Sequence, residues 1–118
     1  MDFITCAWDS DEVAHVTLLV KDYPDEGVSL DDLIPMIHEI REKSTAMIIK
    51  ADLIGASIIN IDRFKLILKI VKEVVDYTRE DNLLKQIQFV NTGLIFRTLY
   101  STISFAVPKY FRDIVVFL

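Results

Sequence analysis

Residues 83–118 read LLKQIQFVNTGLIFRTLYSTISFAVPKYFRDIVVFL, and the spacing of the apolar residues changes twice along this stretch. The alternation in LLKQIQFVN (83–91) predicts a strand, and the wider spacing in GLIFRTLYSTISFAVP (93–108) predicts a helix. The final RDIVVFL (112–118) is typical of a short core strand that helices cover. A strand, a helix and a second strand in this order favour two parallel strands joined by a right-handed crossover.

The same alternation begins at residue 29 with a helix. Ser29 is suited to an N-cap, and Asp31 and Asp32 follow in the first turn, where the helix dipole favours negative charge. The apolar residues of SLDDLIPMIHEI (29–40) fall on one side of this helix. Pro35 lies inside the segment, so the sequence predicts either a later start or a kink.

The next two segments continue the pattern. AMIIKADLIG (46–55) predicts a strand that is buried on both faces, as in the centre of a parallel sheet. NIDRFKLILKIVKEVVDYTRE (60–80) predicts the longest helix, capped by Asn60 or Asp62. Its apolar residues form a wide stripe, and lysines and acids occupy the other side.

The N-terminal residues predict an antiparallel hairpin. DFITCAW (2–8) and VAHVTLLVKDY (13–23) are β-rich, and the acidic turn DSDE (9–12) separates them. Together, all these segments predict one α/β domain over residues 1–118. Its sheet is expected to be mixed and mostly parallel, with five or six strands flanked by three helices.

Composition excludes several classes of protein. The 118 residues include 18 acidic and 13 basic ones, and the resulting net charge of −5 argues against nucleic acid as a partner. The uncharged runs are shorter than the ~20 residues of a spanning helix, and the acidic N-terminus does not resemble a signal peptide. The single cysteine, Cys6, cannot form an internal disulfide, so we expect a cytoplasmic protein.

Few residues suggest chemistry. His15 and His38 have no partner at metal-ligand spacing, so neither a metal site nor a cofactor is expected. Ser57 follows a strand, but no base can be assigned to it. Asp52 and Asn91 follow two adjacent strands, where α/β sheets often bind ligands, although stabilisation of the turns is the favoured interpretation. We therefore predict no enzymatic activity.

The segments MIIKADLIGASIIN (47–60) and 86–118 resemble the CRAL-TRIO lipid-binding domain of phosphatidylinositol-transfer and tocopherol-transfer proteins. Asp52 and Gly55 match the Asp-x-x-Gly turn that follows one strand of this family. With the helix at 29–40, the resemblance covers roughly residues 13–118. It implies an α/β fold and a lipid-binding function.

Further matches follow along the chain. Asn91 matches the end of the family's next strand, with Thr92-Gly93 in place of the usual Ala-Pro pair. Phe96 and Tyr100 match aromatic positions of the following helix, and RDIVVFL matches the final strand. Family members also carry an N-terminal helical module and a C-terminal gate helix over the lipid cavity, and neither is expected here.

Hydrophobic residues make up 52% of the chain, above the usual share of about 45–50%, and residues 94–107 are apolar nearly all round. Packing on the sheet covers one face only. Either neighbouring segments cover the other face, as in an ordinary core helix, or it needs a ligand, a second copy of the chain or a membrane. With the resemblance, this predicts a non-enzymatic module that binds a lipid or other apolar ligand, and peripheral membrane contact is a further expectation. The expected ligand-binding residues are Phe64, Leu68, Phe96, Tyr100, Ile103 and Phe105, with Lys109 and Arg112 for an anionic headgroup.

A second family provides the alternative. STAS domains are similar in their strand–helix alternation and length, and they act as protein-interaction modules without lipid. On this interpretation the chain is a homodimeric scaffold, and an interface of ~1,600 Å² would cover the apolar surplus. The phosphorylatable serine of that family would correspond to Ser57.

Overall fold

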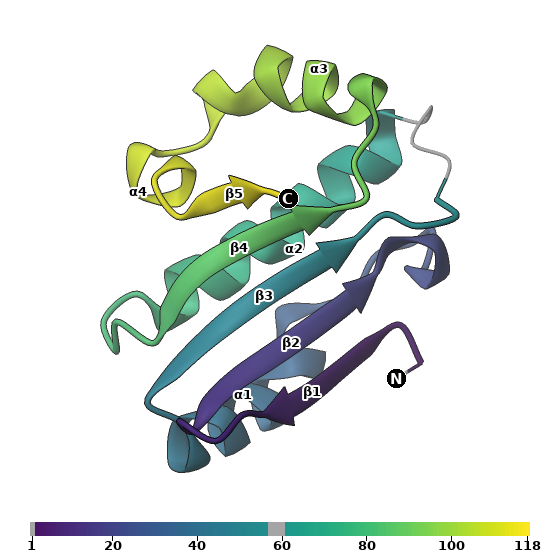
Figure 1. Ribbon diagram of the computed structural model, residues 1–118. Helices are drawn as coiled ribbons and strands as arrows, with labels where there is room; N and C mark the ends of the chain where they lie inside the picture. The colour runs from purple at the N-terminus through teal and green to yellow at the C-terminus, as the bar shows by residue number, and fades with distance from the viewer. Residues whose placement is uncertain (1, 57–60) are drawn as a thin grey trace.

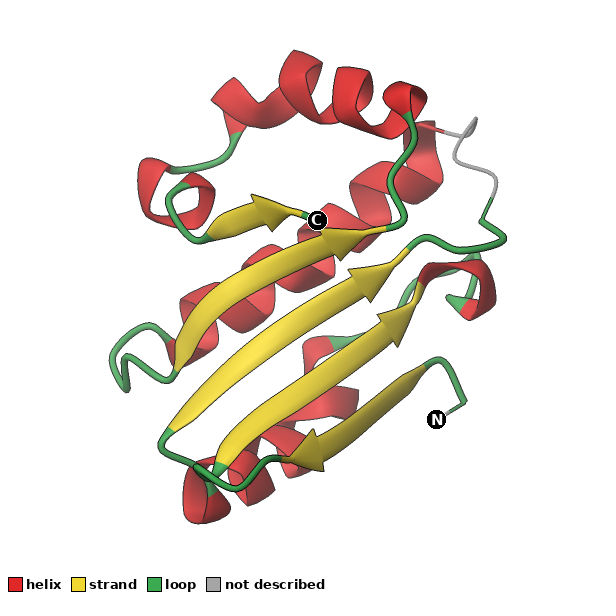
Figure 2. Ribbon diagram, viewed as in Figure 1, coloured by secondary structure: helices red, strands yellow, loops and turns green. Residues whose placement is uncertain are grey.

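The computed structural model describes residues 2–56 and 61–118, and these residues form five strands and four α-helices (Figures 1 and 2). The strands are β1 (Ile4–Trp8), β2 (Val13–Leu19), β3 (Ala46–Asp52), β4 (Leu84–Val90) and β5 (Val115–Phe117). The α-helices are α1 (Leu30–Lys43), α2 (Ile61–Thr78), α3 (Leu94–Ile103) and α4 (Lys109–Arg112). Two short 3-10 helices are η1 (Val20–Asp22) and η2 (Ser104–Ala106).

The strands form one sheet in the order β1-β2-β3-β4-β5, which is also their order in the sequence. β1 is antiparallel to β2, and the later strands all pair in parallel. The predicted α/β class, with a mixed, mostly parallel sheet, is therefore confirmed. The described residues form four α-helices rather than three. The helix predicted over residues 93–108 ends at Ile103, and a further short helix, α4, follows Pro108, which is its N-cap residue.

Helices cover one face of this sheet. α1 and α2 lie behind it in Figure 1, as expected when right-handed crossovers all step to the next strand in the same direction. In β3 the side chains of Met47, Ile49 and Ala51 are buried, whereas Ile48 is half-buried and Lys50 is exposed. The prediction that this strand is buried on both faces is wrong, because all the crossovers run on one side.

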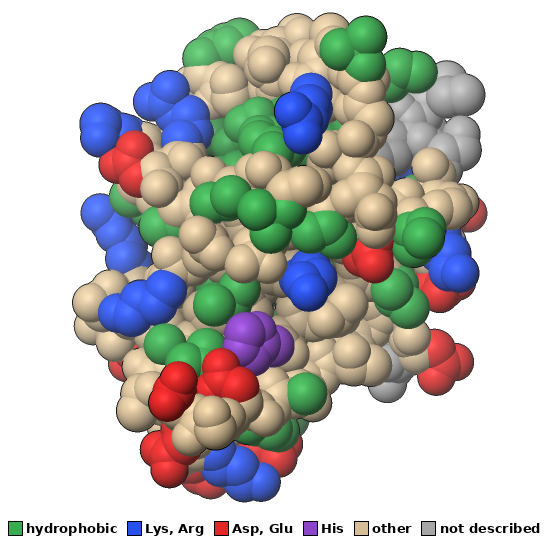
Figure 3. Space-filling view, in the orientation of Figure 1, with side chains coloured by type: hydrophobic (Ala, Val, Ile, Leu, Met, Phe, Trp, Pro, Cys, Tyr) green, Lys and Arg blue, Asp and Glu red, His purple; other side chains and the backbone are tan. Residues whose placement is uncertain are grey.

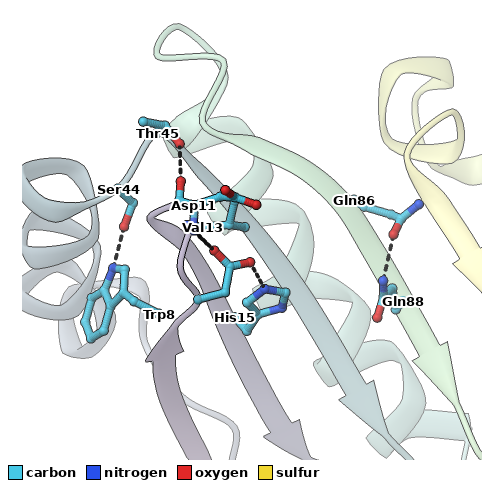
Figure 4. A network of polar contacts seen from close by, with 9 residues as sticks. Trp8, Asp11, Val13, His15, Ser44, Thr45, Gln86 and Gln88 are labelled. Carbon is cyan, nitrogen blue, oxygen red and sulfur yellow. Dashed lines mark hydrogen bonds and ion pairs between the residues drawn. The ribbon is translucent and has the colours of Figure 1, made fainter.

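The opposite face of the sheet carries both polar and apolar side chains. Thr17, Lys50, Gln88 and Val116 are aligned in one row across β2, β3, β4 and β5. Beside this row, Gln88 Nε2 donates to Gln86 Oε1 at 2.7 Å (Figure 4). In Figure 3 hydrophobic side chains on this face are interspersed with polar side chains and backbone.

Helix α1 begins as predicted. The Oγ of Ser29 accepts a hydrogen bond from the backbone N–H of Asp31 at 3.2 Å, and Pro35 lies inside the helix without delaying its start. Asp62 lies in the first turn of α2, so the prediction that it caps this helix is wrong. Asn60, the other predicted cap, lies outside the described residues.

The C-terminal strand forms, but it is only partly covered. β5 pairs with β4 over Val115, Val116 and Phe117, and these three residues are half-buried. Leu118 is 60% exposed. The predicted strand is thus confirmed, whereas complete coverage of the final residues is not, because β5 lies at the edge of the sheet.

Candidate ligand-binding site

Helix α3 runs along the β5 edge of the sheet and lies against α2 (Figure 1). Gly93 is its N-cap residue and supplies no side-chain hydrogen bond, and the first turn contains no acidic residue. Within the helix only Phe96 and Tyr100 are buried, and both lie on the side that faces the sheet. A few aromatic contacts therefore hold this helix in place.

These contacts form an aromatic cluster, called here the α3 cluster, of Phe64, Phe89, Phe96, Tyr100 and Phe117. The ring of Phe96 lies 5.0 Å from the ring centroids of both Phe64 and Phe89. The ring of Tyr100 lies 5.1 Å from that of Phe117 and 5.9 Å from that of Phe89. The near-perpendicular arrangements are those that aromatic quadrupoles favour. The cluster joins α2, α3, β4 and β5.

Part of the predicted site lies in or beside this cluster. Phe64, Phe96 and Tyr100 belong to it, and Leu68 is buried on the same helix as Phe64. The rings of Phe96 and Tyr100 lie between α3 and the sheet. Two residues of the cluster, Phe89 and Phe117, were missed by the sequence analysis. The sequence signal that could have identified them is that each lies at an inward-facing position of a predicted strand.

The remaining predicted site residues lie away from the cluster centre. Ile103 is half-buried, and Phe105, which follows it in η2, is 80% exposed. Lys109 Nζ forms an ion pair with Asp113 Oδ2 at 2.8 Å. Arg112 is exposed. These residues are therefore placed on the surface around the cluster.

The hydroxyl of Tyr100 is the polar atom of the cluster. Tyr100 is 8% exposed, and its buried oxygen has no hydrogen-bond partner within the described residues. Burial raises the pKa of this hydroxyl, and the positive charge of Arg112 partly offsets that effect. A buried donor without a partner costs about 1–3 kcal/mol, so a ligand that accepts its hydrogen bond would gain from it.

A separate apolar cavity lies between the sheet and helices α1 and α2. It measures about 40 Å³ and is lined by apolar and aromatic residues, among them Phe3, Leu18, Ile37 and Val71. A water molecule occupies roughly 30 Å³ of liquid, so this space is far smaller than an acyl chain. It does not adjoin the residues predicted to bind a lipid.

The outer side of α3 exposes apolar residues. Leu94 is 81% exposed and Ile95 is 62% exposed, and Phe105 continues the exposed surface beyond the helix. In Figure 3 hydrophobic side chains lie along the upper edge of the molecule, where Figure 1 places α3. No helix among the described residues has the length and hydropathy needed to cross a bilayer.

Asp52 and Asn91, at the ends of β3 and β4, contact each other. Asn91 Nδ2 donates to Asp52 Oδ1 at 2.8 Å, and the same oxygen accepts from the backbone N–H of Ile54. The bond from Asn91 is the largest cause that lowers the pKa of Asp52. Asn91 has φ of 57°, which asparagine tolerates better than most residues. The two side chains therefore stabilise adjacent turns, as the favoured interpretation predicted.

Replacing Asn91 with alanine is expected to lower the free energy of unfolding by about 2 kcal/mol. Roughly half of this loss is backbone strain, because alanine tolerates the positive φ at this position poorly. Roughly the other half is the lost hydrogen bond, whose contribution is taken at the low end of its usual range because both groups are exposed to solvent. The pKa of Asp52 should rise toward its ordinary value, as measured by NMR titration. Because the pKa of Asp52 is lower in the folded than in the unfolded protein, ionised Asp52 stabilises the fold at pH values above the unfolded-state pKa. The share of the stability loss that comes from the hydrogen bond should therefore disappear as the pH falls through the pKa of folded Asp52.

Asn91→Gly is the matched control for this prediction. Glycine removes the amide but adopts positive φ without strain, so it should cost about 1 kcal/mol while raising the pKa of Asp52 equally. An unchanged Asp52 pKa in both variants would contradict the assigned contact.

Neither histidine belongs to a group of three or more potential metal ligands within the described residues. His15 Nε2 pairs with Asp9 Oδ2 at 2.9 Å beside the β1–β2 turn, and Trp8 Nε1 donates to Ser44 Oγ nearby (Figure 4). The pairing with His15 is the largest cause that lowers the pKa of Asp9. Among the described residues no group of three or more His, Cys, Asp or Glu could hold a metal ion. Ser57 lies outside those residues.

Comparisons with known proteins identify a fold but no close relative. No protein-family model matches the sequence, and no curated protein matches it. Among solved structures, the crystal structure of Sfh5, a CRAL-TRIO protein of the Sec14 family, superposes with a TM-score of 0.64 at 18% sequence identity. The match covers 99% of this chain and 49% of Sfh5, so the chain spans about half the length of that protein. The architecture is consistent with a Sec14-like fold.

Proposed function

We propose that this chain is a non-enzymatic lipid-binding module in which an anionic lipid with one acyl chain binds between α3 and the sheet. The observation that carries the proposal is the buried Tyr100 hydroxyl, which has no hydrogen-bond partner within the described residues. A ligand carboxylate or phosphate could accept the hydrogen bond that this hydroxyl offers. The CRAL-TRIO-like fold supports lipid binding in general.

Binding requires α3 to move, because its own side chains occupy the space below it. The helix is suited to this movement, since its N-cap offers no side-chain hydrogen bond and only Phe96 and Tyr100 are buried. Elements with few buried contacts open at low free energy. An apolar chain entering the site would replace the contacts that the rings of Phe89 and Phe117 lose when α3 withdraws.

The size and charge of the site favour a ligand with one chain. The space that Phe96 and Tyr100 vacate is that of two aromatic side chains, each with roughly 150–250 Å² of surface. The two acyl chains of a bilayer phospholipid would need more. Arg112 acts electrostatically on Tyr100, and Lys109 lies three residues before it, so an anionic group near the hydroxyl would be favoured.

Binding of oleate tests the proposal. The purified protein should retain a fatty acid in native mass spectrometry, and delipidated protein should bind oleate more tightly than methyl oleate. Tyr100→Phe should weaken oleate binding about ten-fold, because a hydrogen bond to a charged group is lost, and should change methyl ester binding little. The same variant should be at least as stable to heat as the wild type, since the removed hydroxyl is unpaired in the folded protein.

Tyr110→Phe is the matched control, because the Tyr110 hydroxyl already donates to Asp76. It should leave oleate affinity unchanged. A ligand-free dimer that binds neither oleate nor its ester would overturn the proposal and favour the homodimeric scaffold. Equal loss of affinity in both tyrosine variants would mean that Tyr100 does not contact the acid group.

A further inference from the structure

Strand β1 forms one edge of the sheet, and among the described residues it pairs with β2 alone (Figure 1). At its two ends, Phe3 O accepts from the backbone N–H of Leu19 at 2.7 Å, and the N–H of Asp9 donates to Val13 O at 3.1 Å. In an antiparallel ladder the backbone groups of alternate residues point to the same side. The backbone groups that point away from the sheet therefore belong to Ile4, Cys6 and Trp8.

The side chains of β1 alternate between the two faces of the sheet. Trp8 Nε1 donates to the Oγ of Ser44, the C-cap residue of α1, at 2.6 Å (Figure 4). Ile4 and Cys6 lie on the same face as Trp8, and all three are half-buried. Thr5 and Ala7 are exposed on the opposite face. The side chains beside the outward-pointing backbone groups are therefore those that α1 partly covers.

The β1 edge lacks the features that commonly protect an exposed strand. Such features are lysine or proline within the strand, a bulge, or a very short length. β1 contains five uncharged residues in regular register with β2, and none of them is proline. β5, at the other edge of the sheet, has three residues. The β1 edge can therefore accept a further strand without placing a charge in the new ladder.

From this arrangement we infer that β1 pairs with β1 of a second copy of the chain, in antiparallel orientation, about a two-fold axis at Cys6. In this register all the outward-pointing residues are hydrogen-bonded, since Cys6 faces its own counterpart and Ile4 faces Trp8 of the second copy. On the exposed face Thr5 lies opposite Ala7 of the second copy. The two sheets become one continuous sheet.

The strand is suited to a copy of itself. Ile4 and Trp8 are both apolar and half-buried, so pairing brings two apolar side chains together at each end of the interface. Asp9, which follows the strand, would lie opposite Phe3 of the second copy rather than opposite an acid. A two-fold axis also closes the assembly, because it uses both β1 edges and leaves the short β5 edges outside.

The two α1 helices would lie on the same face of the continuous sheet, one on each side of the axis. Glu39 of α1 acts electrostatically on Cys6, so this carboxylate is the acid of α1 that approaches the axis. It already forms an ion pair with Lys43 at 2.9 Å. Each Glu39 therefore brings its own cation to the interface.

Charge variants at the exposed positions of β1 test the register. T5K/A7K places lysine opposite lysine on both sides of the axis, and it should raise the dimer dissociation constant in sedimentation velocity about ten-fold. The fold should be kept, because Thr5 and Ala7 are exposed. The matched variant T5K/A7E places lysine opposite glutamate and keeps the net charge of −5, so it should dimerise at least as tightly as the wild type. Equal weakening in the two variants would overturn the inference.

Hydrogen exchange followed by NMR tests the same pairing on the backbone. The amide protons of Ile4, Cys6 and Trp8 should be protected in the wild-type dimer and exchange rapidly in T5K/A7K under monomeric conditions. Those at positions 5 and 7 point toward β2 and should be protected in both. Rapid exchange of the first set in the dimer would show that the copies meet elsewhere. A wild type that stays monomeric at millimolar concentration would also contradict the inference.

This inference does not depend on the proposed ligand. β1 and the α3 cluster lie at opposite edges of the sheet, so T5K/A7K should bind oleate as tightly as the wild type. A wild-type dimer that binds no oleate would leave the β1 pairing in place, whereas an oleate-binding monomer would overturn the pairing alone.

Discussion

Replacing Phe89 with alanine is expected to lower the free energy of unfolding by about 3–5 kcal/mol, the usual cost of deleting a buried phenyl ring. Phe89 is 1% exposed and lies at the centre of the α3 cluster, where its ring contacts those of Phe96, Tyr100 and Phe117. The loss should be near the upper end of that range. A cavity at this position borders β4, β5 and α3 together, and the strand backbone cannot collapse to fill it.

Urea denaturation followed by circular dichroism measures this effect. A domain of this size has a stability of about 5–15 kcal/mol, so the variant should lose a large part of it. Phe105→Ala is the matched control, because it deletes the same ring at an 80% exposed position and should change stability by less than about 0.5 kcal/mol. Similar midpoints for the two variants would show that Phe89 is not in the core. α3 should also lose protection from hydrogen exchange first in Phe89→Ala, because this ring supports it.

The second large effect is expected at Arg63, in the first turns of α2. Its Nη2 donates to the carbonyl oxygens of Val20 and Tyr23, at 2.9 and 2.5 Å, and its Nη1 forms an ion pair with Asp25 at 2.5 Å. A single guanidinium thus fixes the segment that connects β2 to α1. Arg63→Met keeps most of the aliphatic stem but removes these donors. We expect it to cost about 2–3 kcal/mol, since hydrogen bonds from charged groups contribute about 1.5–3 kcal/mol and part of the loss is recovered by water.

Arg63→Lys should recover little of the loss, because an ammonium group cannot reach two carbonyls and a carboxylate in the planar geometry of a guanidinium. Lys65→Met is the control, since Lys65 lies on the same helix and is exposed. It should change stability by less than about 0.5 kcal/mol. The amide protons near Val20 and Tyr23 should exchange faster in Arg63→Met than in the control. Equal exchange in the two variants would contradict the structural role given to Arg63.

Much of the fold was predictable because local patterns agree with it. The alternation over residues 84–90 and the helical spacing after Gly93 correspond to β4 and α3. Ser29 predicts the start of α1, because a hydroxyl followed by two acids satisfies the first turn. The open face of the sheet was not predictable in this way. It follows from the order of the strands, and this order depends on contacts between distant residues that no local pattern specifies.

The candidate site was predictable only in part, and for a physical reason. Apolar residues on α2 and α3 mark a buried cluster, and Phe64, Phe96 and Tyr100 lie in it. Periodicity cannot distinguish an aromatic residue that fills its own core from one that lines a space for a ligand. Phe105 illustrates the converse. It continues the apolar pattern of α3, but the chain turns into η2 before it, and the side chain is exposed.

The strand order of the sheet has a consequence for biosynthesis. Every strand pairs with the strand that precedes it in the chain, so each new strand meets an existing edge as the polypeptide leaves the ribosome. Among the described strands, none has to insert between two that have already paired. These strands can therefore pair one after another from β1 onward, and the three-residue β5 is the last of the five to pair.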